Sequence, residues 1–287
     1  MRRALLGVMI LALVLVAVLD VGPLLGIPGA VDAIATVSAG FAFSLLHGYL
    51  AWGWKNLLAF VAITLAISFA AEAIGVATGA VFGPYHYTDL FGPRILGVPP
   101  VIQIGYLAVG YSSIVMGRII LSLLKPVAGW AIVAASLAGA AIMVGWDVCM
   151  DPLQSTAAGD WIWRDGGPYF GVPLSNYAGW FATVFAFMLV YYLFASRTIE
   201  APRTDLQGSP ALFWSLPVIY YGLMAFNIIM TFALGAVSLP YAASANYGGT
   251  PEQMTGSMAL LAIFVMGSPI VFALGRLIVG RGKADPA

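Results

Sequence analysis

The chain has 287 residues, with 12 basic and 12 acidic side chains and no net charge at pH 7. Hydrophobic residues make up 61% of it, charged residues only 8%, and the mean hydropathy is +0.96. These values exclude a soluble globular domain, which needs more polar surface, and a nucleic-acid-binding protein, which needs a basic face.

Apolar segments long enough to cross a bilayer recur along the whole chain. The first follows Arg2 and Arg3, as in a signal peptide, but no small-residue cleavage site comes after it, so we expect a retained helix; cleavage would leave seven spans. The prediction is an all-α, polytopic membrane helix bundle in which residues 1–287 form a single transmembrane domain. The eight expected spans are about 4–20, 33–52, 57–76, 101–122, 126–147, 176–195, 210–236 and 257–277.

The basic residues predict how the helices are oriented. With eight helices and a cytoplasmic N-terminus, only Arg94 and Arg164 fall in outer loops. This bias follows the positive-inside rule, so we expect an integral protein of the cell (inner) membrane with both termini in the cytoplasm. The basic residues expected at inner ends are Arg2, Arg3, Lys55, Arg118, Lys125, Arg197, Arg203, Arg276, Arg281 and Lys283.

The residue inventory excludes several membrane chemistries. Two histidines, His47 and His86, are too few for a histidine-rich di-iron centre, and the single Cys149 excludes a thiolate-clustered metal site. The chain has no G-x-G-x-x-G turn for a flavin or nicotinamide, and no paired Asp-rich motifs that would hold magnesium diphosphate. We therefore expect neither a metal nor a cofactor.

Two acidic, aromatic stretches, at 72–87 and 146–180, interrupt the apolar sequence, and both fall on the outer side of the expected topology. A carboxyl group at or near a membrane is costly and is a functional candidate by default. The candidates with catalytic roles are Asp147, Asp151 and Glu72.

These three carboxyl groups are expected near outer helix ends. There the helix dipole, burial and, for Asp147, a like-charged neighbour one turn away all favour the neutral form. One of the three can then act as a proton donor at neutral pH, and Asp147 is the first choice. Pro152 predicts that Asp151 leaves helical geometry, so that the pair straddles the helix end.

Aromatic side chains gather in the same stretches, and their faces can stabilise the carbocation that a protonated alkene becomes. The ordinary alternative for each one is the interfacial aromatic belt of a membrane protein. His86 is either a proton relay or a structural histidine, and Asn176 either a substrate ligand or a helix N-cap. The candidate substrate-binding residues are Trp146, Trp161, Trp163, Tyr85, Tyr87, His86 and Asn176.

Together these stretches, within a signature region of about 70–180, resemble a family of integral-membrane carotenoid biosynthesis proteins whose characterised members are carotenoid 1,2-hydratases. In the first stretch the matching residues are Glu72, Gly75, Thr78, Gly79, Phe82, Gly83, Tyr85 and Tyr87, followed by Gly97, Val98 and Pro99. In the second they are Asp147, Asp151, Pro152, Trp161, Trp163, Gly166, Tyr169, Gly171, Val172, Pro173, Asn176, Gly179 and Trp180.

The resemblance implies a hydro-lyase that adds water across the terminal double bond of an acyclic carotenoid end group without a cofactor. It implies a carotenoid substrate dissolved in the bilayer and other carotenoid enzymes as possible partners. The catalytic assignments rest on the residue argument above, not on the resemblance. Three alternatives stay open. One is an end-group isomerase or cyclase using the same acid, and another is a non-catalytic carotenoid- or lipid-binding or assembly protein. The third is a transporter with the outer acidic residues as proton or cation sites, although these residues are expected at helix ends and not at the bilayer midplane.

Overall fold

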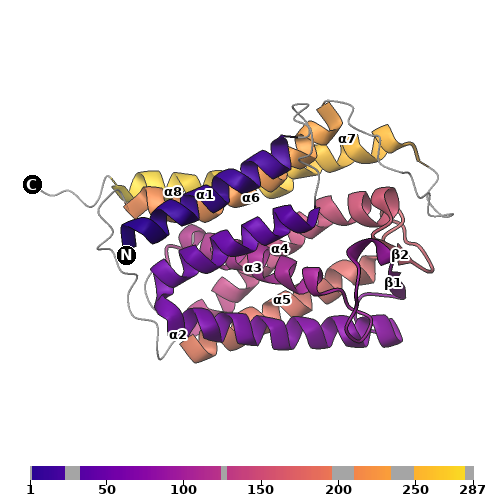
Figure 1. Cartoon of the computed structure of the whole chain (residues 1–287), viewed down its shortest axis with the longest axis horizontal. Helices are drawn as coiled ribbons and strands as arrows, with labels where there is room; N and C mark the ends of the chain where they lie inside the picture. Colours follow the sequence, from indigo (N-terminus) through magenta and orange to yellow (C-terminus); the bar gives the residue numbers. More distant parts are fainter. Residues whose placement is uncertain (1, 23–32, 124–127, 196–209, 234–248, 282–287) are drawn as a thin grey trace, which may run out of the picture.

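The structure is a computed structural model that describes residues 2–22, 33–123, 128–195, 210–233 and 249–281. Its long helices lie alongside one another in a bundle (Figure 1), so the predicted all-α architecture is confirmed. The helices are α1 (Arg2–Val21), α2 (Ala33–Thr78), α3 (Pro100–Ile120), α4 (Trp130–Asp151), α5 (Leu174–Ala195), α6 (Pro210–Ala233), α7 (Pro251–Leu261) and α8 (Gly267–Arg281). A π-helical segment, η3 (Pro152–Ala158), prolongs α4, and another, η4 (Ala262–Met266), joins α7 to α8.

α2 is two helices joined at a sharp reversal. As one straight helix its 46 residues would extend about 69 Å, more than twice the thickness of a bilayer's hydrocarbon core. Gly53 has φ 77° and ψ 168°, a conformation that a side chain would oppose, and the two arms double back there (Figure 1). The two spans expected at 33–52 and 57–76 are therefore separate passes.

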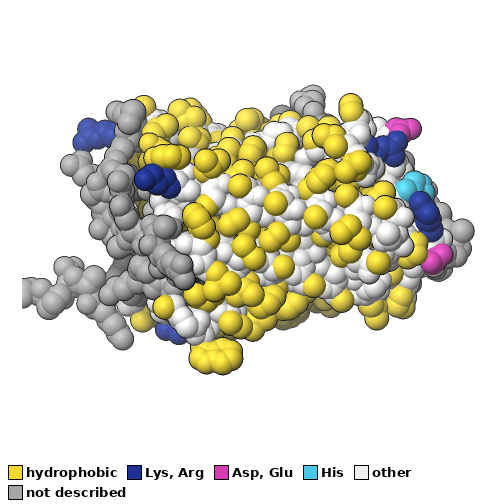
Figure 2. Space-filling view, turned by 90° about the horizontal axis from the view of Figure 1, so that it is seen from below, with side chains coloured by type: hydrophobic (Ala, Val, Ile, Leu, Met, Phe, Trp, Pro, Cys, Tyr) yellow, Lys and Arg dark blue, Asp and Glu magenta, His cyan; other side chains and the backbone are white. Residues whose placement is uncertain are grey.

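Within the described residues, seven helices are long and apolar enough to cross a membrane, and α2 counts as one of them. Because α2 makes two passes, this agrees with the eight expected spans. Hydrophobic side chains cover the middle of the face in Figure 2, with charged side chains toward its two ends. The chain is a membrane protein. Four of the basic residues behind the predicted orientation, Lys125, Arg197, Arg203 and Lys283, lie outside the described residues.

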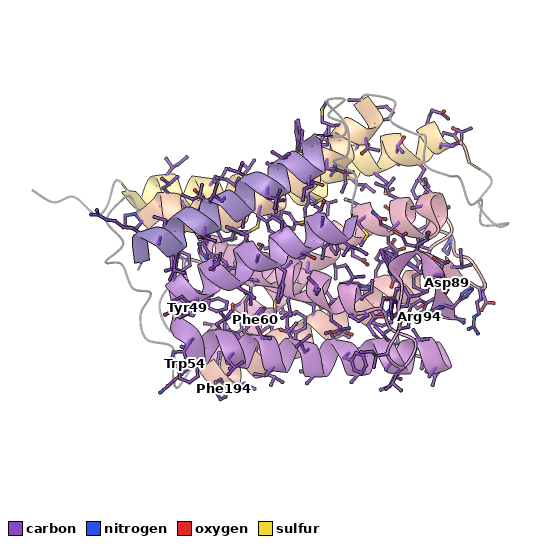
Figure 3. The ribbon with its side chains drawn as sticks, viewed as in Figure 1. Tyr49, Trp54, Phe60, Asp89, Arg94 and Phe194 are labelled. Atoms are coloured by element: carbon purple, nitrogen blue, oxygen red, sulfur yellow. The ribbon has the colours of Figure 1, made fainter. Side chains whose placement is uncertain are left out.

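Two short strands cross one end of the bundle, here called the site end. β1 (Tyr85–Tyr87) and β2 (Trp161–Trp163) pair antiparallel, with Tyr85 opposite Trp163 and Tyr87 opposite Trp161. After β1, a 3-10 turn, η2 (Asp89–Phe91), leads to Arg94, whose guanidinium pairs with Asp89 and donates to the Tyr87 carbonyl oxygen at 2.6 Å. Asp89 and Arg94 lie at the site end in Figure 3, whereas Trp54 and Phe194 lie at the opposite end.

Close contacts between helix backbones hold the bundle together, both in its interior and at the site end. A Cβ at Gly117 of α3 would lie 3.0 Å from the Gly139 nitrogen of α4, so these two backbones approach as only small residues allow. At the start of α5, a Cβ at Gly179 would lie 2.2 Å from the Val81 carbonyl oxygen, in the turn between α2 and β1. Gly179 thus allows α5 to contact the backbone just before β1.

We expect Gly179→Ala to destabilise the protein by about 1–3 kcal/mol, because the added methyl group must displace backbone rather than a flexible side chain. Thermal unfolding in detergent measures this as a lower Tm. Gly275→Ala in α8 is the matched control, since a Cβ there meets nothing within 4 Å. Equal Tm values for the two variants would show that α5 does not depend on this contact.

Candidate functional site

Glu72, in the second arm of α2, is 2% exposed and accepts three tyrosine hydrogen bonds. The hydroxyl groups of Tyr85 and Tyr87 donate to its Oε2 atom at 2.5 and 2.8 Å, and that of Tyr106 donates to Oε1 at 2.9 Å. Burial, and then the nearby charge of Glu72, raises the pKa of Tyr85 and Tyr87 above the ordinary tyrosine value. Both hydroxyls therefore keep their protons, and both oxygens of Glu72 are held as acceptors.

Asp151 is bound in the same way, by nitrogen donors. The indole Nε1 atoms of Trp161 and Trp163 donate to its Oδ1 atom at 3.1 and 3.3 Å, and the Asn176 amide donates to Oδ2 at 2.6 Å. The pairing of β1 with β2 therefore places two of the three tyrosine donors of Glu72, Tyr85 and Tyr87, beside the strand that carries the tryptophan donors of Asp151.

Asp147 lies one helical turn before Asp151 and shares a donor with it. The same Asn176 nitrogen that contacts Asp151 donates to Asp147 Oδ2 at 3.1 Å, so the two carboxyl groups are neighbours. The Oδ1 atom of Asp147 is buried and has no hydrogen-bond partner among the described residues. Asp147 is thus the least satisfied acceptor of the three carboxyl groups.

The expectation that Asp151 leaves helical geometry, so that the pair straddles a helix end, is wrong. Asp151 has φ −55° and ψ −47°, and the helix continues through Pro152 into η3. Proline removes the N–H that would bond the carbonyl four residues earlier, which is that of Val148. The hydroxyl of Tyr169 donates to this carbonyl at 3.0 Å and replaces the missing bond. Both aspartates therefore project from continuous helix.

A cavity of about 140 Å³ lies between these groups. Glu72 and Asp151 line it, whereas Asp147 does not; Asp147 accepts a hydrogen bond from Asn176, which does line the cavity. Most of the remaining lining is aromatic: Phe82, Tyr85, Tyr87, Phe91, Tyr106, Trp146, Trp161, Trp163 and Trp180. Tyr106 and Trp180 stack face to face with ring centroids 4.3 Å apart, which fixes one wall.

The three carboxyl groups have no cationic partner among the described residues. Arg94 is the basic residue nearest in sequence to β1, and it pairs with the exposed Asp89 instead. All donors to these carboxyl groups are neutral hydroxyl, indole or amide groups. The arrangement therefore combines acidic groups and aromatic faces without charge compensation, which suits a cationic or proton-accepting guest.

The family described as carotenoid biosynthesis protein matches residues 5–249, which is most of the chain. The chain belongs to the carotenoid biosynthesis protein family. A relative in Haloarcula japonica, a bisanhydrobacterioruberin hydratase, is 34% identical over 126 residues, 43% of this chain and 40% of the relative. The chain thus matches less than half of that relative's length. No solved structure matches the chain.

In this carotenoid biosynthesis protein the two stretches singled out from the sequence do meet at one site. The structure brings together Glu72, Asp147, Asp151, Tyr85, Tyr87, Trp146, Trp161, Trp163 and Asn176. His86 is not brought to the site: it alternates with the two buried tyrosines of β1, and its side chain is exposed on the other face. Asn176 is buried and donates to both aspartates.

Sequence reasoning missed Tyr106 and Gln154, which also line the cavity of this family member. Tyr106 lies outside both stretches, in α3, where its hydroxyl and the Gln103 amide are polar groups in an apolar span. Polar side chains within an apolar span are a sequence signal from which Tyr106 and Gln154 could have been predicted as site residues. The alternation in Tyr-His-Tyr and Trp-Ile-Trp was a signal for the two strands.

Asp160 lies between η3 and β2, outside the spans. Burial raises the pKa of its carboxyl group from 3.8 to about 6. The folded protein then holds a proton that the unfolded chain releases, so stability falls as the pH rises from about 4 to 6 and stays lower above that range.

We expect Asp160→Asn to stabilise the protein at about pH 8 by an amount on the order of 1 kcal/mol, allowing for partial solvent screening of this carboxyl group. At about pH 3 and below the two proteins should unfold at nearly the same temperature, because Asp160 is then largely protonated in both the folded and the unfolded state. Thermal unfolding in detergent at both pH values is the measurement. A stabilisation that does not depend on pH would exclude ionisation of Asp160 as its cause.

Proposed function

We propose that this protein is a carotenoid 1,2-hydratase, which adds water across the terminal C1=C2 double bond of an acyclic carotenoid end group. The observation that carries the proposal is a largely aromatic cavity lined by two carboxyl groups from different helices, Glu72 and Asp151. A third carboxyl group, Asp147, shares a donor with Asp151, and none of the three has a basic partner among the described residues. Family membership and the hydratase name of the Haloarcula relative support it.

The chemistry begins with proton transfer to carbon. One proton is shared by the Asp147–Asp151 pair, and Asp151 delivers it to C2 because Asp151 lines the cavity. A new C2–H bond forms, the double bond breaks, and a tertiary cation is left at C1. Hydrogen bonds from Trp161, Trp163 and Asn176 then stabilise the Asp151 carboxylate that remains.

The sequence favoured Asp147 as the acid that protonates the substrate. The hydrogen bonds instead support a role for Asp147 as the group that holds the proton before Asp151 transfers it. Asp147 has one donor and one unpartnered oxygen, so it is the member of the pair with room to hold a proton at rest. Because it does not line the cavity, it acts through Asp151. Two carboxyl groups in one buried site rarely ionise together, which keeps a proton on the pair.

The cation is held by the aromatic lining and by charge. Trp146, Trp161 and Trp163 line the cavity, where their rings can stabilise a cation, and Glu72 supplies a carboxylate from α2. Glu72 also orients the water that attacks C1. The C1–O bond forms, the water gives a proton to a carboxylate, and the product is a tertiary alcohol. No cofactor enters this scheme.

We place the protein in the cell membrane with its termini in the cytoplasm, as the basic residues indicate. The site end then faces outward, and the polyene lies between helices with its end group in the cavity. The alternatives are an end-group isomerase or cyclase, in which the same cation loses a proton or closes a ring, and a carotenoid-binding protein without chemistry.

Expression of the full chain in a host that accumulates lycopene or γ-carotene tests the proposal. The expected pigment is heavier than the carotene by one water, as measured by mass spectrometry. A rearranged product of unchanged mass would favour the isomerase or cyclase. Bound but unaltered carotene, co-purifying with protein that is present in the membrane, would favour the carrier.

A further inference from the structure

A second cavity adjoins the first at the site end. It lies among α1, α2, α3, α4 and α6 and has a volume of about 190 Å³. The two cavities share part of their lining, so they are neighbours, and the residues common to both are here called the shared wall. The shared residues are Val37, Gly105, Trp146, Met150 and Gln154.

The second cavity carries polar groups that the site does not use. Asp20, Thr36, Tyr220 and Asn227 line it, and Gln154 faces it from the shared wall. One carboxyl oxygen of Asp20 is buried and has no hydrogen-bond partner among the described residues. Buried polar atoms normally have a partner, and a polar cavity with room for several water molecules supplies one.

The first cavity, in contrast, offers few unused hydrogen bonds. Both oxygens of Glu72 and both oxygens of Asp151 already accept bonds from protein donors. Its remaining lining is largely aromatic and aliphatic, which favours a hydrocarbon end group over a store of water. A nucleophilic water must therefore reach C1 from a neighbouring space.

We propose that the second cavity holds water and delivers it to the cation in the first cavity through the shared wall at Gln154. The Gln154 side chain can both accept and donate a hydrogen bond, which suits transfer of water between the two spaces. This inference rests on the proposed hydratase function and assigns the source of its second substrate.

The cation at C1 can react in two ways, and comparing the two products distinguishes a defect in water supply from a defect in proton transfer. Capture by water forms the C1–O bond and yields the alcohol. Loss of a proton from C2 restores the starting alkene, and in D₂O this leaves deuterium on C2 without adding water. The ratio of hydration to deuterium exchange therefore reports how well water reaches the cation.

The test uses the full-length protein in liposomes with lycopene in D₂O, with both products followed by mass spectrometry. We expect Asp20→Leu to lower the ratio of hydration to exchange by on the order of tenfold, because the cavity loses the carboxyl group that would bind water while the acid pair is intact. Asp165→Leu is the control, since it makes the same change on an exposed loop outside both cavities.

Thr36→Val is a second variant, nearly equal in volume, which keeps the test valid if Asp20→Leu does not fold. A wild-type ratio in either variant, with the protein at normal level in the membrane, would overturn the inference. Equal loss of hydration and exchange would also overturn it, because water supply would then not be the step affected. Absence of both reactions in the unsubstituted protein would refute the proposed function itself.

Discussion

Asp151→Asn is expected to abolish hydration, with product formation reduced at least about 100-fold, while the protein still folds. Asp151 is the member of the acid pair that lines the cavity, and an amide cannot transfer a proton to an alkene. The new amide oxygen can keep the bonds from Trp161 and Trp163, and the Asn176 amide can rotate to accept from the new NH₂ group. The measurement is hydrated product per unit of protein in the membrane.

Asp165→Asn is the matched control, because this aspartate lies just after β2 and is exposed. It should hydrate like the unsubstituted protein. Asp147→Asn should also lose hydration, since the pair then has no second carboxyl group to share the proton. If Asp151→Asn retained hydration and Asp147→Asn did not, Asp147 would have to reach the substrate directly, as the sequence alone suggested.

The helical spans were predictable from the sequence because each one is a long apolar run, and burial in lipid leaves helices as the structure available to such runs. The reversal at Gly53 was predictable too, since Gly53 and Lys55 interrupt the apolar pattern. The course of α4 was not. Pro152 argues locally for a helix end, and the bond that compensates for it comes from Tyr169, 17 residues further along the chain.

The membership of the site was largely predictable, because carboxyl groups in an apolar chain are few and costly. The separate roles of the three carboxyl groups were not predictable from the sequence. Glu72 and Asp151 each accept three hydrogen bonds, whereas Asp147 accepts one. This difference depends on the pairing of β1 with β2, strands that are about 75 residues apart in the chain. Tyr106 was missed for the same reason: it reaches Glu72 from α3, outside both stretches.

Glu72→Gln is expected to cause the second large loss, in stability as well as activity. Tyr85, Tyr87 and Tyr106 all donate to this carboxylate, and an amide replaces one acceptor oxygen by a donor. At least one buried hydroxyl then lacks an acceptor, which costs about 1–3 kcal/mol. The cavity also loses the negative charge proposed to stabilise the cation. We expect a lower Tm in detergent and hydration reduced on the order of 100-fold.

Tyr106→Phe separates the two effects, because it removes one donor and leaves the Glu72 carboxylate with Tyr85 and Tyr87. It should lower the Tm by no more than Glu72→Gln does and keep most of the hydration. Equal loss of hydration in the two variants would mean that Glu72 serves only to anchor the tyrosines. If Glu72→Gln instead lost hydration at an unchanged Tm, the charge of Glu72 would matter for the reaction while the tyrosine hydrogen bonds contributed little to stability. The expected difference follows from the position of Glu72, which both anchors β1 and lines the cavity.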